Sequence, residues 1–207
     1  MAGDENNDAG DAAGLAAMIA RAADQTAGGK PGLPPVERWN PAFCGDIDME
    51  ILADGTWFYL GTPIGRAPLV RLFSTVLRKD EDGKTYLVTP VEKLGIKVAD
   101  AHFVAVEMTV GASNGEPVLT FRTNVGDLVE AGPEHPLRFV IEGEHQQLKP
   151  YLAVRGRLEA LVSRAVTYEL MALGEVIDID GQAMFAIRSG GETFAIMPAA
   201  DLDGLAS

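Results

Sequence analysis

Glycine-containing turns divide much of this chain into short segments, and this division limits the possible folds more than any other feature. Asp-Gly or Asn-Gly pairs stand at residues 54–55, 82–83, 114–115 and 180–181. Such pairs favour tight hairpin turns, because those turns need positive φ angles. Next to the first pair, Ile47 to Ile51 alternates apolar and acidic residues, which is the pattern of a half-buried strand. The sequence therefore predicts antiparallel sheets.

Apolar residues at three- and four-residue spacing predict two helices among these strands. The first opens after the loop Gly61 to Arg66, with Pro68 near its start. We expect its buried stripe to consist of Leu69, Leu72, Phe73, Val76 and Leu77. Arg71 and Arg78 should lie outside this stripe. The second, which we expect to be the longest helix, runs from Arg157 to Leu173. The predicted fold class is therefore α+β.

The N-terminal segment differs from the rest of the chain. It is acidic and then alanine-rich, with Leu15, Met18 and Ile19 at helical spacing, so a short amphipathic helix is predicted. Residues 26–35 contain the Gly and Pro residues of a linker. We expect three parts: an acidic segment and linker over 1–38, an N-terminal α+β domain over 39–131, and a C-terminal α+β domain over 132–207.

Charge and cysteine content restrict the possible partners and compartments. The chain has 17 basic and 30 acidic residues, a net charge of −13, which disfavours binding along a nucleic acid polymer. A small anion needs only two or three arginines and is not excluded. Cys44 is the one cysteine, so no internal disulfide can form. No apolar run approaches the ~20 residues of a membrane span, and the acidic N-terminus is unlike a signal peptide, so we expect a cytoplasmic protein.

Catalytic signatures are not found in the sequence. His102, His135 and His145 are scattered, which predicts no metal site. The Gly-x-Ser-x-Gly match at residues 111–115 spans a predicted turn between two strands and is not a strand-to-helix elbow, and there is no P-loop or Rossmann glycine pattern. Asp48 and Glu50 share one strand face, but adjacent carboxylates there are more typical of a solvated face than of an acid-base pair. We therefore expect no enzymatic activity and identify no catalytic residue.

Two sequence neighbourhoods are candidates for anion binding in the first half. Arg66 lies just before a predicted helix N-terminus, where exposed N–H groups and the helix dipole favour negative charge. The alternative is a structural loop in which Arg66 pairs with Asp48 or Glu50. Thr89 and Lys93 follow a predicted strand and could face a phosphate, or they could belong to a solvated turn.

A third candidate lies along the second predicted helix. Arg155, Arg157, Arg164 and Tyr168 would bring three guanidinium groups and a phenol near one helix edge. Salt bridges with Glu159 and Glu169 would explain the same residues, because arginines often extend from an apolar face.

A weak internal repeat relates the two halves. Leu69-Val70 in the first predicted helix corresponds to Leu161-Val162 in the second, and each helix precedes an Asp-Gly turn and a strand. Two copies of one strand-helix-strand unit would explain this correspondence, and so would chance recurrence of common elements. Two similar domains would leave a groove between them, and such interfaces are frequent ligand sites.

Several motifs together resemble one known family. They are Gly45-Asp46-Ile47-Asp48-Met49, Asp54-Gly55-Thr56-Trp57-Phe58-Tyr59, Gly61-Thr62-Pro63-Ile64-Gly65-Arg66, Leu69-Val70-Arg71-Leu72-Phe73, Tyr86-Leu87-Val88-Thr89-Pro90-Val91-Glu92-Lys93 and Ala160-Leu161-Val162-Ser163-Arg164 with Tyr168. From about Trp39 onward the chain resembles the bacterial domain of unknown function 1285. The resemblance implies a duplicated αβ architecture with a pleckstrin-homology-like C-terminal half. It also implies a ligand site at the domain interface, suited to a nucleotide-like molecule, and a signalling role.

The sequence and the resemblance together lead to one functional hypothesis. We expect a non-enzymatic protein in which two related domains bind a small anionic, nucleotide-like ligand. Arg66 and Arg164 would pair with phosphate, and Trp57 or Tyr59 would stack on a ring. The candidate ligand-binding residues are Trp57, Tyr59, Arg66, Thr89, Glu92, Lys93, Arg155, Arg157, Arg164 and Tyr168. The alternative is a module for oligomerisation or for binding a protein partner, and an enzyme ranks third. No cofactor is identified.

Overall fold

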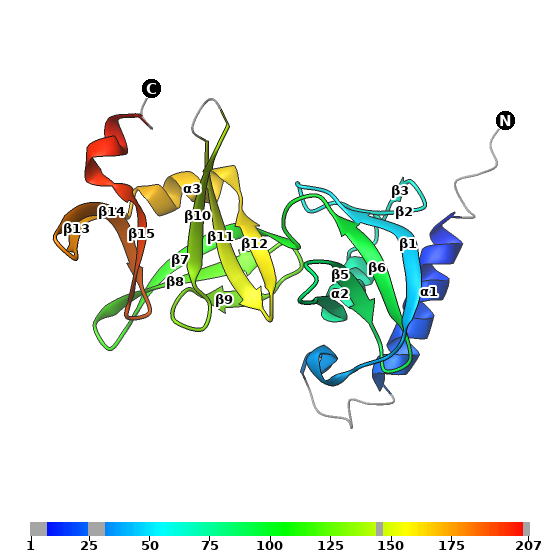
Figure 1. Ribbon diagram of the computed structural model, residues 1–207. Coiled ribbons are helices and arrows are strands. Elements are labelled where there is room, and N and C mark those ends of the chain that lie inside the picture. The colour runs from blue at the N-terminus through cyan, green and yellow to red at the C-terminus, as the bar shows by residue number, and fades with distance from the viewer. Residues whose placement is uncertain (1–7, 25–31, 144–146, 205–207) are drawn as a thin grey trace. The chain divides into compact units, whose positions relative to one another are not determined.

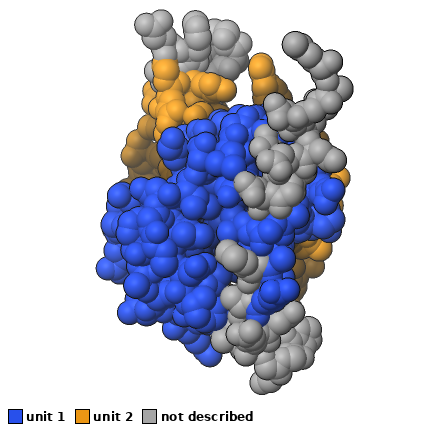
Figure 2. Space-filling view, turned by 90° about the vertical axis from the view of Figure 1, so that its right-hand side faces the viewer, with its two compact units in different colours: residues 1–102, 156–158 blue, residues 103–155, 159–207 orange. Residues whose placement is uncertain are grey.

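The chain divides into two compact units, which Figure 2 shows in different colours. The computed structural model describes residues 8–24, 32–143 and 147–204. Unit 1 comprises residues 1–102 and 156–158, and unit 2 comprises residues 103–155 and 159–207. The domain boundary that the sequence predicts between residues 131 and 132 lies inside unit 2.

A six-stranded sheet with the order β3-β2-β1-β6-β5-β4 forms the framework of unit 1 (Figure 1). β1 and β6 are parallel, and all other neighbouring pairs are antiparallel. The elements of unit 1 are α1 (Asp8–Asp24), the 3-10 helix η1 (Val36–Arg38), β1 (Phe43–Ile51), β2 (Trp57–Tyr59), β3 (Thr62–Pro63), α2 (Ala67–Thr75), β4 (Leu77–Lys79), β5 (Thr85–Val88) and β6 (Lys93–Val98).

The core of unit 1 forms between one face of this sheet and α2. Trp57 on β2 stacks on Phe73 of α2, with ring centroids 6.1 Å apart. Met49, Ile51 and Leu87 complete this apolar cluster from β1 and β5. The predicted N-terminal helix is present as α1, which packs against α2 and buries Ala12, Ala16 and Ile19.

The first predicted helix ends earlier than its apolar stripe suggested. α2 stops at Thr75, and Leu77 and Arg78 lie on β4, opposite Leu87 and Tyr86 of β5. The prediction that Arg78 lies outside the buried stripe is wrong, since its side chain is buried. A β-branched pair, Thr75-Val76, ends the helix, and such residues suit a strand better than a helix.

Unit 2 contains a second six-stranded sheet and a smaller one. The large sheet has the order β10-β11-β12-β7-β8-β9, with β7 and β12 parallel, and the small sheet has the order β13-β14-β15. The elements are β7 (Phe103–Ser113), β8 (Glu116–Thr123), β9 (Leu128–Glu130), β10 (Leu137–Glu142), β11 (Gln147–Arg155), β12 (Leu158–Val162), α3 (Arg164–Met171), β13 (Glu175–Ile179), β14 (Gln182–Ser189), β15 (Glu192–Pro198) and the 3-10 helix η2 (Ala199–Gly204).

The two large sheets share one topology, which confirms the predicted duplication. In each sheet, the first three strands in chain order form one half and the next three strands form the other half. The first and the sixth strand in chain order are parallel neighbours at the centre of the sheet. The residue correspondence drawn from the sequence is wrong. Leu161 and Val162 lie on β12, opposite Val104 and Ala105, whereas Leu69 and Val70 lie in α2.

The prediction of one long helix over Arg157 to Leu173 is also wrong. Its first part is β12, where Leu158, Ala160 and Val162 alternate inward with the period of a strand. The helix begins only after Ser163, whose hydroxyl accepts a hydrogen bond from the Val166 N–H. The sequence of residues 158–162, Leu-Glu-Ala-Leu-Val, fits the spacing of apolar residues in a helix as well as in a strand. The pairing with β7 makes it a strand.

The α+β fold class is confirmed, with two sheet-based units and few helices. The pleckstrin-homology-like fold of the C-terminal half stays a prediction. None of the described helices combines the length and apolar composition that crossing a bilayer requires.

Candidate functional site

A cavity of about 390 Å³ opens in unit 1, and residues of four strands of its sheet line it. The register places Lys79 of β4, Thr85 of β5 and Ile96 of β6 opposite one another, so their side chains share one sheet face. The wall is completed by β1, by the β4–β5 turn and by the segment after β6, and the lining residues are Asp46, Ile47, Lys79, Gly83, Lys84, Thr85, Gly95, Ile96, Lys97, Val98, Asp100 and His102.

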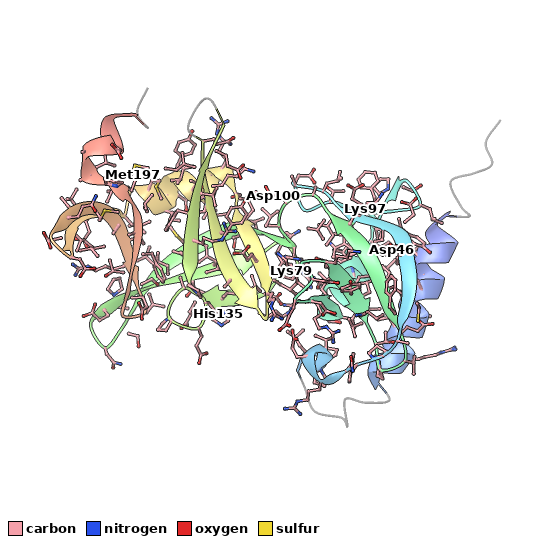
Figure 3. The ribbon with its side chains drawn as sticks, in the orientation of Figure 1. Asp46, Lys79, Lys97, Asp100, His135 and Met197 are labelled. Atoms are coloured by element: carbon pink, nitrogen blue, oxygen red, sulfur yellow. The ribbon has the colours of Figure 1, made fainter. Side chains whose placement is uncertain are left out.

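Lysines dominate the charge of this cavity. Lys79, Lys84 and Lys97 are three of the six lysines in the chain, and two aspartates, Asp46 and Asp100, are also among the lining residues. None of the three lysines forms an ion pair with a described residue. The cavity therefore has one positive charge in excess, although the whole chain carries −13. Figure 3 labels Lys79, Lys97, Asp46 and Asp100 on this unit.

Two buried polar groups form the inner wall. The Thr85 Oγ1 and His102 Nε2 atoms lie 3.0 Å apart, and their side chains are both buried. Asp46 lies over Gly95, where a Cβ atom would overlap its carboxylate. A glycine at residue 95 is therefore required for the position of Asp46 at the edge of the cavity.

A network of charged side chains lies beside this cavity. Arg78 donates to Asp80 Oδ1 at 2.5 Å and to the carbonyl oxygens of Val36 and Trp39 at 2.8 and 2.6 Å. The hydrogen bond from Arg78 holds the pKa of Asp80 below its ordinary value. The Tyr86 hydroxyl donates to Asp82 Oδ2 at 2.5 Å, which lowers the pKa of Asp82 and raises the pKa of Tyr86 to about 12.

This network has the electrostatics of a structural site. A general acid near neutral pH needs a raised carboxyl pKa, whereas the pKa values of Asp80 and Asp82 are lowered. Among the residues that the structure describes, no group of three or more His, Cys, Asp or Glu is placed to hold a metal ion.

The aromatic and arginine candidates of unit 1 occupy different environments. Trp57 is 1% exposed and belongs to the core, while Tyr59 is half-buried on β2. Arg66 is exposed at the start of α2, and its side chain forms no ion pair with Asp48, Glu50 or any other described residue. Arg157 forms an exposed ion pair with Glu81 at 2.8 Å.

The polar candidates between β5 and β6 are engaged in local contacts. The Thr89 hydroxyl accepts from the Glu92 N–H at 3.0 Å and closes the turn between the strands. The Glu92 side chain is half-buried in the same turn. Lys93 Nζ lies 3.2 Å from Asp80 Oδ2 and 4.6 Å from the centroid of the Tyr86 ring. The structure therefore brings Thr89 and Glu92 together in a turn and Lys93 into the Arg78 network.

The remaining candidates belong to unit 2. Arg155 pairs with Asp127 at 2.6 Å and lies over the Phe103 ring. Arg164 is exposed at the first turn of α3, and its Nη2 atom donates to the Tyr168 hydroxyl at 3.2 Å. The anticipated partner Glu159 instead pairs with Arg138. None of the ten candidate residues lines the lysine cavity of unit 1.

Comparison with known proteins identifies the family. The model of the N-terminal domain of the domain of unknown function DUF1285 matches residues 34–101, and that of the DUF1285 C-terminal domain matches residues 102–196. A crystal structure of a DUF1285 family protein from Silicibacter pomeroyi is 46% identical, with a TM-score of 0.78, over 89% of this chain and 97% of that chain. The chain belongs to the DUF1285 family.

A second DUF1285 family structure, from Shewanella baltica, is 28% identical over 58% of this chain and 87% of that chain, with a TM-score of 0.46. No curated protein matches this DUF1285 protein. The two matched DUF1285 domains meet between residues 101 and 102, next to the division between the compact units.

Proposed function

We propose that this DUF1285 protein binds a small anionic, nucleotide-like ligand without catalysing a reaction, and that the lysine cavity of unit 1 is the binding site. The observation that carries the proposal is that Lys79, Lys84 and Lys97 line one cavity and form no ion pair with a described residue. Lysine ammonium groups are strong hydrogen-bond donors to phosphate.

The size and chemistry of the cavity support this ligand class. Its volume of about 390 Å³ lies within the usual range for small-molecule sites. Ile47, Ile96 and Val98 provide an apolar wall against which a flat ring could pack, while the lysines bind the charged end. A signalling role would follow if the ligand is a regulatory nucleotide, and it belongs to this proposal.

A thermal-shift assay with a panel of mono-, di- and triphosphate nucleotides tests the proposal. Binding at a hundred times the dissociation constant adds about 2.7 kcal/mol to the free energy of unfolding, which raises the Tm by several degrees. The variant K79M/K84M/K97M should lose this shift. The matched control is K149M, because Lys149 pairs with Glu142 in unit 2 and lies outside the cavity.

Two results would contradict the proposal: no nucleotide raises the Tm of the wild-type protein, or the triple variant and K149M keep the same shift. Chromatography of the bound nucleotide after long incubation tests whether the protein binds the nucleotide without converting it. We expect the nucleotide to be recovered unchanged, and accumulation of a product would show an enzyme.

A further inference from the structure

Unit 2 contains a groove of about 730 Å³ along the outer face of β8 and β9, and this groove has a different chemistry. The register places Thr120 opposite Glu130 and Arg122 opposite Leu128, so alternate side chains of the two strands share this face. The intervening Leu119, Phe121 and Val129 are buried on the other face. The groove is therefore built on the solvent side of the sheet.

Carboxylates give the groove its charge. Glu116, Glu130 and Glu134 are exposed along it, none forms an ion pair with a described residue, and no lysine or arginine is among its lining residues. His135, which Figure 3 labels, directs its Nδ1 atom to the Ala153 carbonyl oxygen at 3.1 Å. The groove has three negative charges without a lining cation, so its complement is a partner with several positive charges.

An exposed apolar side chain lies at one end of this face, beyond Glu130 and opposite Arg122. Leu128 is 72% exposed, which is the largest exposed fraction among the large hydrophobic residues of the described chain. Val118 is half-buried on the same face. A purely ionic partner would leave Leu128 in water, so the partner should also present apolar side chains.

The backbone beside the groove favours an extended partner. β9 is the last strand of the sheet and has β8 as its one neighbour in it. The Ala131 N–H donates to Leu119 O, and the Thr123 N–H donates to Asp127 O. Because the antiparallel ladder alternates, the backbone groups of Leu128 and Glu130 point away from β8, where an added strand could pair with them.

From these observations we propose that the groove along β8 and β9 binds an extended segment of a partner protein that presents lysine or arginine and an apolar side chain on the same strand face, at alternate positions of its sequence. A second copy of this chain is a poor occupant, because each copy carries a net charge of −13. This inference goes beyond the nucleotide proposal and rests on a different unit.

Fluorescence anisotropy with the full chain and a labelled peptide of about nine residues, which carries lysine and leucine on one strand face and serine on the other, tests the inference. We expect binding that weakens as salt rises from about 50 to 200 mM. The variant E116Q/E130Q/E134Q should bind about tenfold more weakly at low salt, as expected for three exposed ion pairs. The matched control E50Q/E92Q/E169Q removes the same charge from outside the groove and should bind as the wild type does.

Three results would overturn the inference: no binding at low salt, equal weakening in both triple variants, or equal affinity for the wild type and Leu128→Ser. A fourth concerns ligand class. If spermine displaces the peptide as effectively as an unlabelled copy of the peptide does, the groove is a general cation site and the protein-partner assignment is wrong. We expect spermine to be much the weaker competitor, because it makes no strand pairing with β9.

Discussion

Arg78 is the residue on which the edge of unit 1 most depends. Its buried guanidinium holds the carbonyl oxygens of Val36 and Trp39 and the carboxylate of Asp80. The segment around η1 is thereby attached to β4. An arginine at this position thus has a structural role, which its place in the sequence did not indicate.

We predict that Arg78→Met lowers the free energy of unfolding by about 3 kcal/mol, because it removes charge-assisted hydrogen bonds from a buried site. Urea unfolding followed by circular dichroism measures this. Arg71→Met is the matched control, because Arg71 is exposed on α2, and it should change stability by less than about 0.5 kcal/mol. Equal effects of the two substitutions would show that Arg78 does not anchor the segment.

Asp80 should make the stability of the protein depend on acidic pH. The hydrogen bond from Arg78 lowers its pKa below the ordinary 3.8, so Asp80 contributes stability above that value and loses it as the pH falls through the lower folded pKa. We predict that Asp80→Asn destabilises the protein at pH 7 and that the difference from the wild type shrinks in strong acid. Unfolding curves across this range test it, and a constant difference would contradict the assignment.

Tyr86 should respond at the opposite end of the pH scale. Its hydrogen bond to Asp82 raises its pKa to about 12, so its contribution is present below the ordinary value of 10.0 and is lost as the pH rises towards 12. Spectrophotometric titration of phenolate absorbance should show a transition near pH 12 that Tyr86→Phe abolishes. Asp82→Asn should move that transition towards 10.0. A transition that Asp82→Asn leaves unchanged would contradict this cause.

Among the elements, β14 contacts the large sheet of unit 2, and a buried hydroxyl group at its end bonds to that sheet. Ser189 Oγ donates to Ala131 O at 2.7 Å and accepts from the Leu119 N–H at 2.8 Å. All three residues are buried. The next residue, Gly190, has a φ of +59° and donates its N–H to Pro117 O. A Cβ atom there would lie 2.7 Å from the Ala131 carbonyl oxygen.

We predict that Gly190→Ala destabilises unit 2 by about 2 kcal/mol or more, because strain at positive φ adds to a clash with backbone. Gly191→Ala is the matched control. It also has a positive φ, of +81°, but a Cβ there meets no atom within 4 Å, so we expect a smaller loss. Thermal unfolding of both variants tests this prediction. Equal losses of stability would show that the contact with Ala131 is unimportant.

The hairpin turns could be predicted from the sequence, but the pairing of strands that are far apart in the chain could not. Asn114-Gly115 and Asp180-Gly181 adopt the positive φ angles that their hairpins need, and both hairpins are confirmed. The parallel pairs β1–β6 and β7–β12 join segments far apart in the chain, and no local pattern encodes them. For this reason the local pattern predicts a helix over residues 158–162, which form β12.

At the scale of the whole molecule, one topology occurs twice while the chemistry of the two units differs. Unit 1 concentrates lysines at a cavity, and unit 2 carries a groove lined by glutamates. The duplicated frameworks could therefore serve different ligands. Both are DUF1285 domains, and the functions proposed for them remain separable by experiment.

The lysine cavity shows why the site was harder to predict than the fold. Four of the six lysines lie between residues 79 and 97, and this local enrichment was the available signal. The cavity itself depends on the register across β4, β5 and β6, which brings Lys79, Thr85 and Ile96 side by side and which the sequence does not specify. The interface role of Arg66 and Arg164 stays a prediction.

The most direct test of the central claim is a two-dimensional amide NMR titration of the full chain with the nucleotide that gives the largest thermal shift. We predict that the amide signals of Gly83, Thr85, Gly95 and Lys97 move together and saturate with one dissociation constant, because these residues line the lysine cavity. Shifts confined to the surroundings of Arg66 and Arg164, with the cavity signals unchanged, would contradict the account.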